Sequence, residues 1–275
     1  MLRLTLTLFA LLSVCFSLYP QSAAVIEADY IYTHPVQTMK SAEADVENHY
    51  TLHTDGRMSK FYSPRTEFID SIESTPEGFE AFNTLKRVAW QKGEQDKIPR
   101  VDGSFYVTKF SSPKRLHTYD IASGTKFHMT EPLPEISWEI NDSTKNILGY
   151  ECVMATAGFH GRKWTAWFAP EIPVSDGPWK LRGLPGLILE AASEGGQYRF
   201  IARGLRMSSR PVTDVYGADK WEEIDRKEFW RLRRSCLDNP SRTTAGSAST
   251  IVYKGIAYEK YLPATLVDYI ETDYR

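Results

Sequence analysis

Short segments of alternating apolar and polar residues occur along most of the chain and predict β-strands. Ile26, Ala28, Tyr30 and Tyr32 alternate with polar neighbours, as expected for a strand with one buried face. From residue 104 onward such segments follow one another closely, with turn residues but no helical pattern between them. This spacing favours an antiparallel meander over β–α–β units. The predicted strands are Ser104–Phe110, Arg115–Ile121, Thr125–Thr130, Glu135–Ile140, Tyr150–Ala157, Arg162–Phe168, Leu187–Ala191 and Gln197–Leu205.

The clearest hairpin is predicted over residues 50–62. Asp55 and Gly56 are typical of a two-residue type I′ turn, in which both residues take positive φ values. A turn at these two positions would pair Leu52 with Ser59 across the hairpin.

Two segments have helical periodicity instead. Thr75 before Pro76 is typical of a helix start, with either Thr75 or Ser74 as the cap. Four apolar residues that follow fall on one helical face: Phe79, Phe82, Leu85 and Ala89. A second helix is predicted from Asp219 to Leu237. We therefore expect a mainly β, β-rich α+β fold: a curved antiparallel sheet, or half-barrel meander, with two helices packed against it.

The first 24 residues differ in kind from the rest. Arg3 precedes an apolar run from Leu4 to Leu18, and small residues follow it, as in a cleavable secretory signal peptide. Cys15 would suit a lipoprotein, but the preceding Val14 is bulky where that motif has a small residue. We expect residues 1–24 to be removed and residues 25–275 to form a single β-rich domain in the periplasm or secreted to the cell envelope. No later segment is apolar enough to predict a transmembrane helix.

The composition and the cysteines bear on the class of partner, the strand content and a disulfide. The formal net charge is -2, which gives no reason to expect nucleic acid as a partner. Aromatic residues make up 13% of the chain, which suits half-buried strands. After export, Cys152 and Cys236 form an even pair in an oxidising compartment, so they are either a disulfide or two buried thiols.

One motif carries a family resemblance. The segment Gly183-Leu184-Pro185-Gly186-Leu187-Ile188 lies downstream of Trp138, Gly161-Arg162, Trp164 and Trp167. In this order the residues resemble the GLPGLI family of exported proteins of the Gram-negative envelope, with the firmest match over residues 104–205. The resemblance implies a β-rich periplasmic or secreted protein, with some members associated with outer-membrane receptors. It supplies no catalytic residues.

The motif also has a direct physical interpretation. Pro185-Gly186 has the order of a type II turn, and Leu187 and Ile188 begin an apolar strand. Trp179, a few residues upstream, is then either part of a stiff turn that seals the core or an aromatic side chain presented to a partner. Arg162, Trp164 and Trp167 are the candidate binding residues.

No arrangement of residues in the sequence identifies a catalytic or metal site. His49 and His53 are four residues apart on a strand, too far to share one zinc ion. His117 and His128 flank Ser123-Gly124, so a two-residue loop would place them on one face and a three-residue loop on opposite faces. Two ligands without a third do not make a metal site, and we predict neither a metal nor a cofactor.

Three functions remain open on these grounds. The first is a non-catalytic envelope protein that binds or escorts an envelope partner such as an outer-membrane protein. The second is a periplasmic carrier of an apolar small molecule such as a lipid, held by the curved sheet. The third is a hydrolase with a site assembled in space, although no local signature of an enzyme is present.

Overall fold

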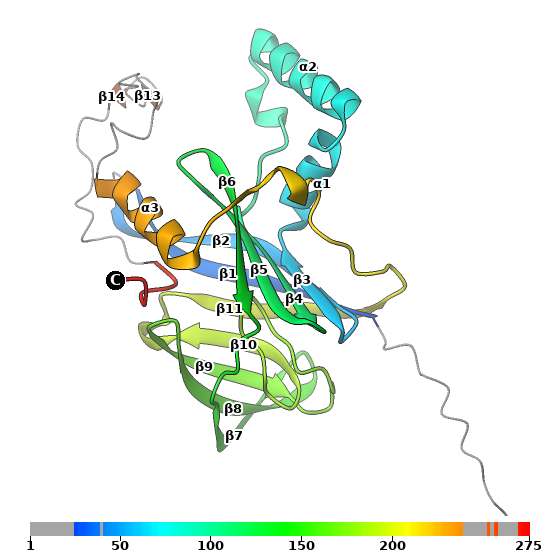
Figure 1. Ribbon diagram of the computed structural model, residues 1–275, viewed down its shortest axis with the longest axis vertical. Coiled ribbons are helices and arrows are strands. Elements are labelled where there is room, and N and C mark those ends of the chain that lie inside the picture. The colour runs from blue at the N-terminus through cyan, green and yellow to red at the C-terminus, as the bar shows by residue number, and fades with distance from the viewer. Residues whose placement is uncertain (1–24, 39–40, 239–251, 254–255, 258–268) are drawn as a thin grey trace, which may run out of the picture.

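A curled sheet of 12 strands forms the body of the protein. The computed structural model describes residues 25–38, 41–238, 252–253, 256–257 and 269–275 (Figure 1). The strand order is β12-β6-β5-β4-β3-β2-β1-β11-β10-β9-β8-β7, and neighbours are antiparallel except β12 and β6. The predicted fold class is confirmed, whereas the predicted signal peptide lies outside the described residues. The strands are β1 Val25–Thr38, β2 Ser41–Thr54, β3 Met58–Tyr62, β4 Tyr106–Ser111, β5 Lys114–Ala122, β6 Thr125–Pro132, β7 Glu139–Ile147, β8 Tyr150–Phe159, β9 Arg162–Ala169, β10 Leu187–Ser193, β11 Arg199–Ser208 and β12 Glu222–Glu223, with a separate pair, β13 Val252–Tyr253 and β14 Ile256–Ala257.

The connection between β6 and β7 shows why the sheet must curl. These strands lie ten positions apart in the sheet, which is about 48 Å at the usual spacing of strands. Only the linker, residues 133–138, joins them, and seven steps of extended chain reach at most about 25 Å. The two ends of the sheet are therefore drawn toward each other. Because residues 133–138 are taken up in crossing from one end of the sheet to the other, β7 begins at Glu139 and not at Glu135 as predicted.

Aromatic side chains fill the inside of the curl. The alternation in β1 places Ala28, Tyr30 and Tyr32 on the buried inner face, as predicted. Tyr32 stacks on Phe200 of β11 with ring centroids 4.5 Å apart. Parallel contacts of this kind add to the free energy gained by burying the rings. The centre of the sheet is thus a packed core.

The β2–β3 hairpin forms at the predicted place with a different register. Leu52 pairs with Phe61, and Thr54 pairs with Ser59. The Asp55 carboxylate accepts hydrogen bonds from the backbone N–H groups of residues 57 and 58, at 2.8 and 2.7 Å, and this moves the turn one residue along the chain. The predicted pairing of Leu52 with Ser59 is therefore wrong by two residues. Since the shift is even, Leu52 stays on the buried face.

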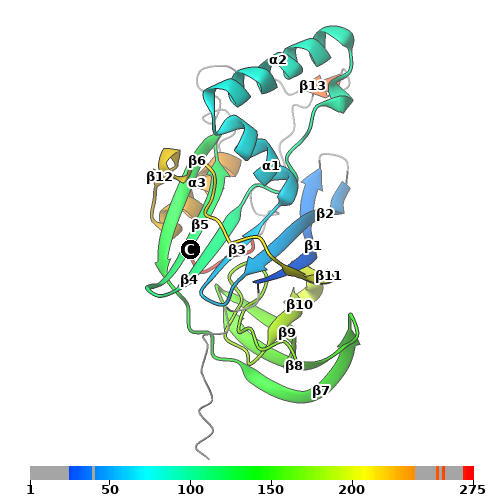
Figure 2. The same ribbon diagram turned by 90° about the vertical axis from the view of Figure 1, so that its right-hand side faces the viewer.

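Three α-helices lie in the described part of the chain. α1, Pro64–Glu73, which the sequence analysis missed, lies against the sheet, and α2, Pro76–Lys92, packs on α1 and stands away from the sheet (Figures 1 and 2). Thr75 caps α2 as predicted, with its hydroxyl accepting from the N–H of Gly78. No helix of the described residues has the length and apolar character needed to cross a membrane. Short 3₁₀ helices occur at Gln95–Lys97, Glu194–Gly196 and Ala218–Lys220.

The last helix, α3, covers Arg226–Asp238 and packs near β5 and β6. It begins later than the predicted Asp219 because Asp225 caps it, accepting hydrogen bonds from the N–H groups of Lys227 and Glu228. The preceding residues pair with β6 as β12, and Trp221 packs on the outer face of the sheet against Tyr119.

Candidate functional site

The motif residues form a tight corner, residues 177–186, between β9 and β10. Gly183 takes a φ of +97°, a conformation that favours glycine. Gly186 does not take a positive φ, so the predicted type II turn at Pro185-Gly186 is wrong. The Gly186 N–H instead donates to the Leu184 carbonyl at 2.9 Å, a three-residue turn around Pro185. A side chain at Gly186 would lie 2.3 Å from the Ala169 carbonyl, which explains the glycine there.

Trp179 anchors the corner in the core. Its side chain is 3% exposed and lies against Trp164, with ring centroids 5.5 Å apart. Leu184, Leu187 and Ile188 are also buried. The corner therefore closes the core, and the indole of Trp179 is not on the surface.

The three candidate binding residues do not meet in one place. Trp164 is fully buried, whereas Trp167 projects from the opposite face of β9 beneath the ammonium of Lys145. Arg162 donates to the carbonyl groups of Tyr269 and Ile270 and so holds the C-terminal segment. None of the three lines the open pocket at one end of the curled sheet.

The corner contributes to a largely buried group of charged residues that we call the polar cluster. Its members are Glu131, His160, Lys180, Arg226, Glu271 and Asp273. Lys180, 1% exposed, donates to Glu131 at 2.6 Å and contacts Glu271 at 2.8 Å. Arg226 contacts Glu131, Glu271 and Asp273. Although burial alone would raise the pKa of the Glu271 carboxyl, Lys180 and the neighbouring cations hold that pKa below its usual value.

Part of the polar cluster has the composition of a metal site. Ligand atoms of His160, Glu271 and Asp273 lie within 4.8 Å of one another. However, Lys180 and Arg226 already neutralise the two carboxylates, and a metal ion would have to displace those cations. The arrangement fits an internal salt-bridge cluster better than a metal centre.

The histidine pair of the β5–β6 hairpin follows from the length of its turn. Ser123 and Gly124 form a two-residue turn with φ values of 53° and 80°, so His117 and His128 lie on one face. Their rings stack, and Nδ1 of His117 lies 2.7 Å from Nε2 of His128. Burial lowers the pKa of both imidazoles, and the charge of His128 lowers that of His117 further.

Cys152 is buried in β8, and burial raises the pKa of its thiol to about 11. The backbone of Cys236 belongs to α3, but its side chain is outside the described part of the structure. The disulfide between them stays a prediction.

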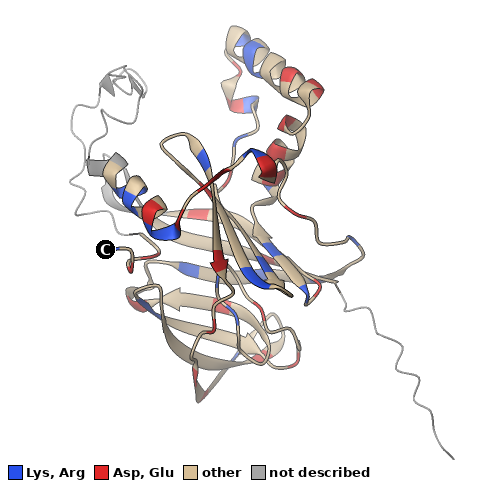
Figure 3. Cartoon of the chain, viewed as in Figure 1, with Lys and Arg blue, Asp and Glu red and all other residues tan. Residues whose placement is uncertain are grey.

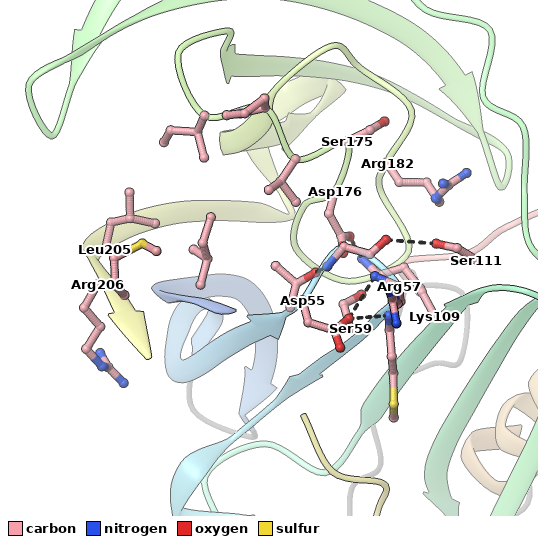
Figure 4. A pocket seen from close by; sticks show the side chains of 18 of the residues that line it. Asp55, Arg57, Ser59, Lys109, Ser111, Ser175, Asp176, Arg182, Leu205 and Arg206 are labelled. Carbon is pink, nitrogen blue, oxygen red and sulfur yellow. Dashed lines mark hydrogen bonds and ion pairs between the residues drawn. The ribbon is translucent and has the colours of Figure 1, made fainter. Parts of the chain in front are cut away.

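An open pocket of about 800 Å³ lies at one end of the curl, and we call it the end pocket (Figure 4). The β2–β3 turn, the ends of β4 and β11, and residues 171–176 before the corner form its walls. Backbone hydrogen bonds fix residues 171–176, since the N–H groups of Leu187 and Ile188 donate to the carbonyls of Ile172 and Asp176. Much of the wall is apolar, from Ile26, Met58, Leu133, Ile172, Val174, Leu205 and Met207.

The polar wall of the end pocket centres on a buried ion pair. The Lys109 ammonium lies 2.5 Å from the Asp176 carboxylate and donates to the Gly177 carbonyl at 2.7 Å. Burial lowers the pKa of Lys109, an effect that Asp176 opposes and Arg182 reinforces. Arg57, Lys109 and Arg182 lie on one side of the pocket and Leu205 on the other (Figure 4). Elsewhere, positive and negative residues are interspersed along the chain (Figure 3).

One segment of the chain is similar to a family of unknown function. Residues 159–190 match a family described as "Protein of unknown function (Porph_ging)", and this segment contains the motif at 183–188. The GLPGLI name itself stays a prediction from the motif. No curated protein matches the sequence.

Solved structures of PNGF-II in two crystal forms are similar to the chain over most of its length. The alignments cover 77% and 76% of this chain and 33% of PNGF-II, with 12% sequence identity and a TM-score of 0.49 in each. The chain thus spans about a third of the length of PNGF-II.

Sequence reasoning found the corner but missed the end pocket and the polar cluster. Lys109 and Asp176 belong to segments 67 residues apart, and Lys180 and Glu271 are 91 residues apart. Strand periodicity gives the face on which a residue lies but not which distant strand or loop it meets. The proline-rich run 170–173 was the one local signal of an unusual loop at the pocket.

Proposed function

We propose that the protein is an exported binding protein of the cell envelope that holds an apolar ligand in the end pocket. The observation that carries this proposal is the volume of about 800 Å³ together with the apolar wall. Pockets for small molecules are typically this large, mostly apolar, and supplied with a few polar groups that orient the ligand.

The walls of the end pocket support binding without a large rearrangement. Strands of the sheet supply Ile26 and Leu205, while Leu133 belongs to the linker and Ile172 to the segment held against β10. Polar contacts also hold the linker and corner together, because the Trp138 indole N–H donates to the Arg182 carbonyl at 2.8 Å. A preformed pocket loses less conformational entropy when a ligand binds.

Export and a single mature domain are part of the same proposal. The basic residue, apolar run and small residues within 1–24 support a signal peptide, and residues 25–275 would then act as one unit in the envelope. A carrier suits that compartment because apolar molecules need protection from water between membranes.

The test is a titration with 1-decanol, a neutral apolar probe, followed by calorimetry. We expect saturable binding of one molecule to the mature chain. Leu205→Asp should weaken it by placing a charge in the apolar wall, while Val88→Asp, at an exposed position of α2, should bind as the unchanged protein does. An absence of saturable binding, or equal binding by Leu205→Asp, would refute the proposal.

Binding of an outer-membrane protein is the second candidate function. Phe79 and Trp90 of α2 are 47% and 68% exposed, and large exposed apolar side chains are typical of protein contacts. A photo-crosslinker at position 79, in cells, should give an adduct with an outer-membrane protein. If the crosslinker forms no adduct with another protein, this second function is refuted.

A further inference from the structure

The polar wall of the end pocket indicates the class of ligand, and this inference rests on the proposed function. We propose that the ligand is an amphipathic anion. Its anionic group lies between Arg57 and Arg182 beside Lys109, and its apolar part lies against Leu205 and Met207 on the other side of the pocket.

Seven charged residues line the pocket. Four are cationic, Arg57, Lys109, Arg182 and Arg206, and three are anionic, Asp55, Glu171 and Asp176. Arg206 is neutralised outside the pocket, which leaves three cations and three anions, so the case for an anionic ligand rests on which cations lack a partner.

Most of these charges already have partners. Lys109 pairs with Asp176, and Arg206 pairs with Glu27 and Asp29 outside the pocket. The carboxylate of Asp55 accepts two backbone N–H groups of its own turn. Asp55, Asp176 and Arg206 therefore shape the wall and are not free to bind a ligand.

Two guanidinium groups are left for a ligand. Within the described residues, Arg57 and Arg182 form no ion pair, and Arg182 donates only to the Pro134 carbonyl at 3.4 Å. Asp55 and Glu171 also form no ion pair in the same part of the chain, but the Asp55 carboxylate is engaged by the backbone of its own turn and Glu171 is exposed. Arg57 and Arg182 are therefore the two cations of the wall that a ligand can engage.

The Lys109 ammonium supplies a further donor. An ammonium has three N–H groups, and the described contacts of Lys109, with Asp176 and the Gly177 carbonyl, use two. The side chain is 4% exposed and lines the pocket, so a ligand bound there is placed to accept from the third N–H. Buried donors without a partner are costly, and an anionic oxygen would remove that cost.

The chemistry of these donors selects a carboxylate or a phosphate. Guanidinium groups bind both through paired N–H···O contacts, which are stronger than contacts between neutral groups. An alkyl carboxylate and an alkyl phosphate share this head-group chemistry, and their relative affinities show which of the two head groups the pocket binds more tightly.

The experiment compares undecanoate, decyl phosphate and 1-decanol at one ionic strength, because all three carry the same ten-carbon alkyl chain and differ only in the head group. At pH 7.5 we expect the better of the two anions to bind about tenfold more tightly than 1-decanol, as one charged hydrogen bond provides. Arg182→Gln should bring that anion to the affinity of 1-decanol and leave 1-decanol unchanged, which also shows that the variant is folded. Arg100→Gln, at an exposed site outside the pocket, is the matched control.

The outcomes separate the two proposals. If all three probes bind equally and Arg182→Gln changes nothing, the ligand is apolar without a recognised charge, and this inference is overturned while the proposed function stands. If 1-decanol and both anions fail to bind, both this inference and the proposed function are refuted.

Discussion

At the scale of the residue, the corner shows how a short motif can mark a position without giving its conformation. Gly183 is favoured by its positive φ, whereas Gly186 is required by the backbone of Ala169 and not by its own φ. Trp179 is the unexpected member, since it is a bulky residue held at a φ of 52°. The sequence indicated that these residues mattered, but their conformations depend on β9, which a local pattern does not include.

Replacing Trp179 by Ala should destabilise the protein by about 3–5 kcal/mol, because the ring is buried against Trp164 and its removal leaves a cavity. Chemical denaturation measures this change. Trp90→Ala is the control, since Trp90 is 68% exposed and its loss should cost less than about 0.5 kcal/mol. Similar small effects for both variants would mean that the corner does not anchor the core.

At the scale of the element, hairpins decide which side chains meet. The two-residue Ser123-Gly124 turn sets the register that brings His117 onto His128, one of two arrangements that the sequence allowed. In the β2–β3 hairpin, an aspartate side chain moved the turn by one residue and changed the pairing by two. Strand positions could be predicted from alternation, whereas register depends on turn contacts that the alternation does not contain.

The histidine pair should make the protein less stable in mild acid. Because the folded protein lowers the pKa of His117 and His128, the unfolded chain binds protons more readily as the pH falls through about 6.5. The free energy of unfolding should then decrease toward the folded-state pKa values, by at most about 1.4 kcal/mol per pH unit for each proton taken up.

Denaturation curves between pH 7.5 and 5 measure this slope. The double variant His117→Gln/His128→Gln should flatten it, and the remaining slope should come from His53 and His160, whose pKa values burial also lowers. His49→Gln, at an exposed position, is the control and should leave the slope unchanged. An unchanged slope in the double variant would contradict the assignment to this pair.

At the scale of the whole molecule, the polar cluster joins segments that are remote along the chain. Lys180 of the corner meets Glu131 at the end of β6, Glu271 of the C-terminal segment and, through them, Arg226 of α3. The curled sheet itself could be predicted from its closely spaced strands. The cluster and the end pocket could not, because both depend on how far the sheet curls before its ends meet.

Lys180→Met should cost about 3–5 kcal/mol, since it leaves the buried Glu271 carboxylate without one of its cations. The control is Lys114→Met, which breaks an exposed pair with Glu135 and should cost less than about 1 kcal/mol. Thermal and chemical unfolding compare the two variants. A cost for Lys180→Met no larger than that for Lys114→Met would show that the cluster does not hold these segments together.

The most direct test of the account is a crystal structure of the mature chain with 10-bromodecanoate, whose bromine is located by anomalous scattering. The account predicts one bromine peak beside Leu205 and Met207, with the carboxylate density near Arg182. A peak on α2 or elsewhere on the surface, with the end pocket holding only water, would contradict it.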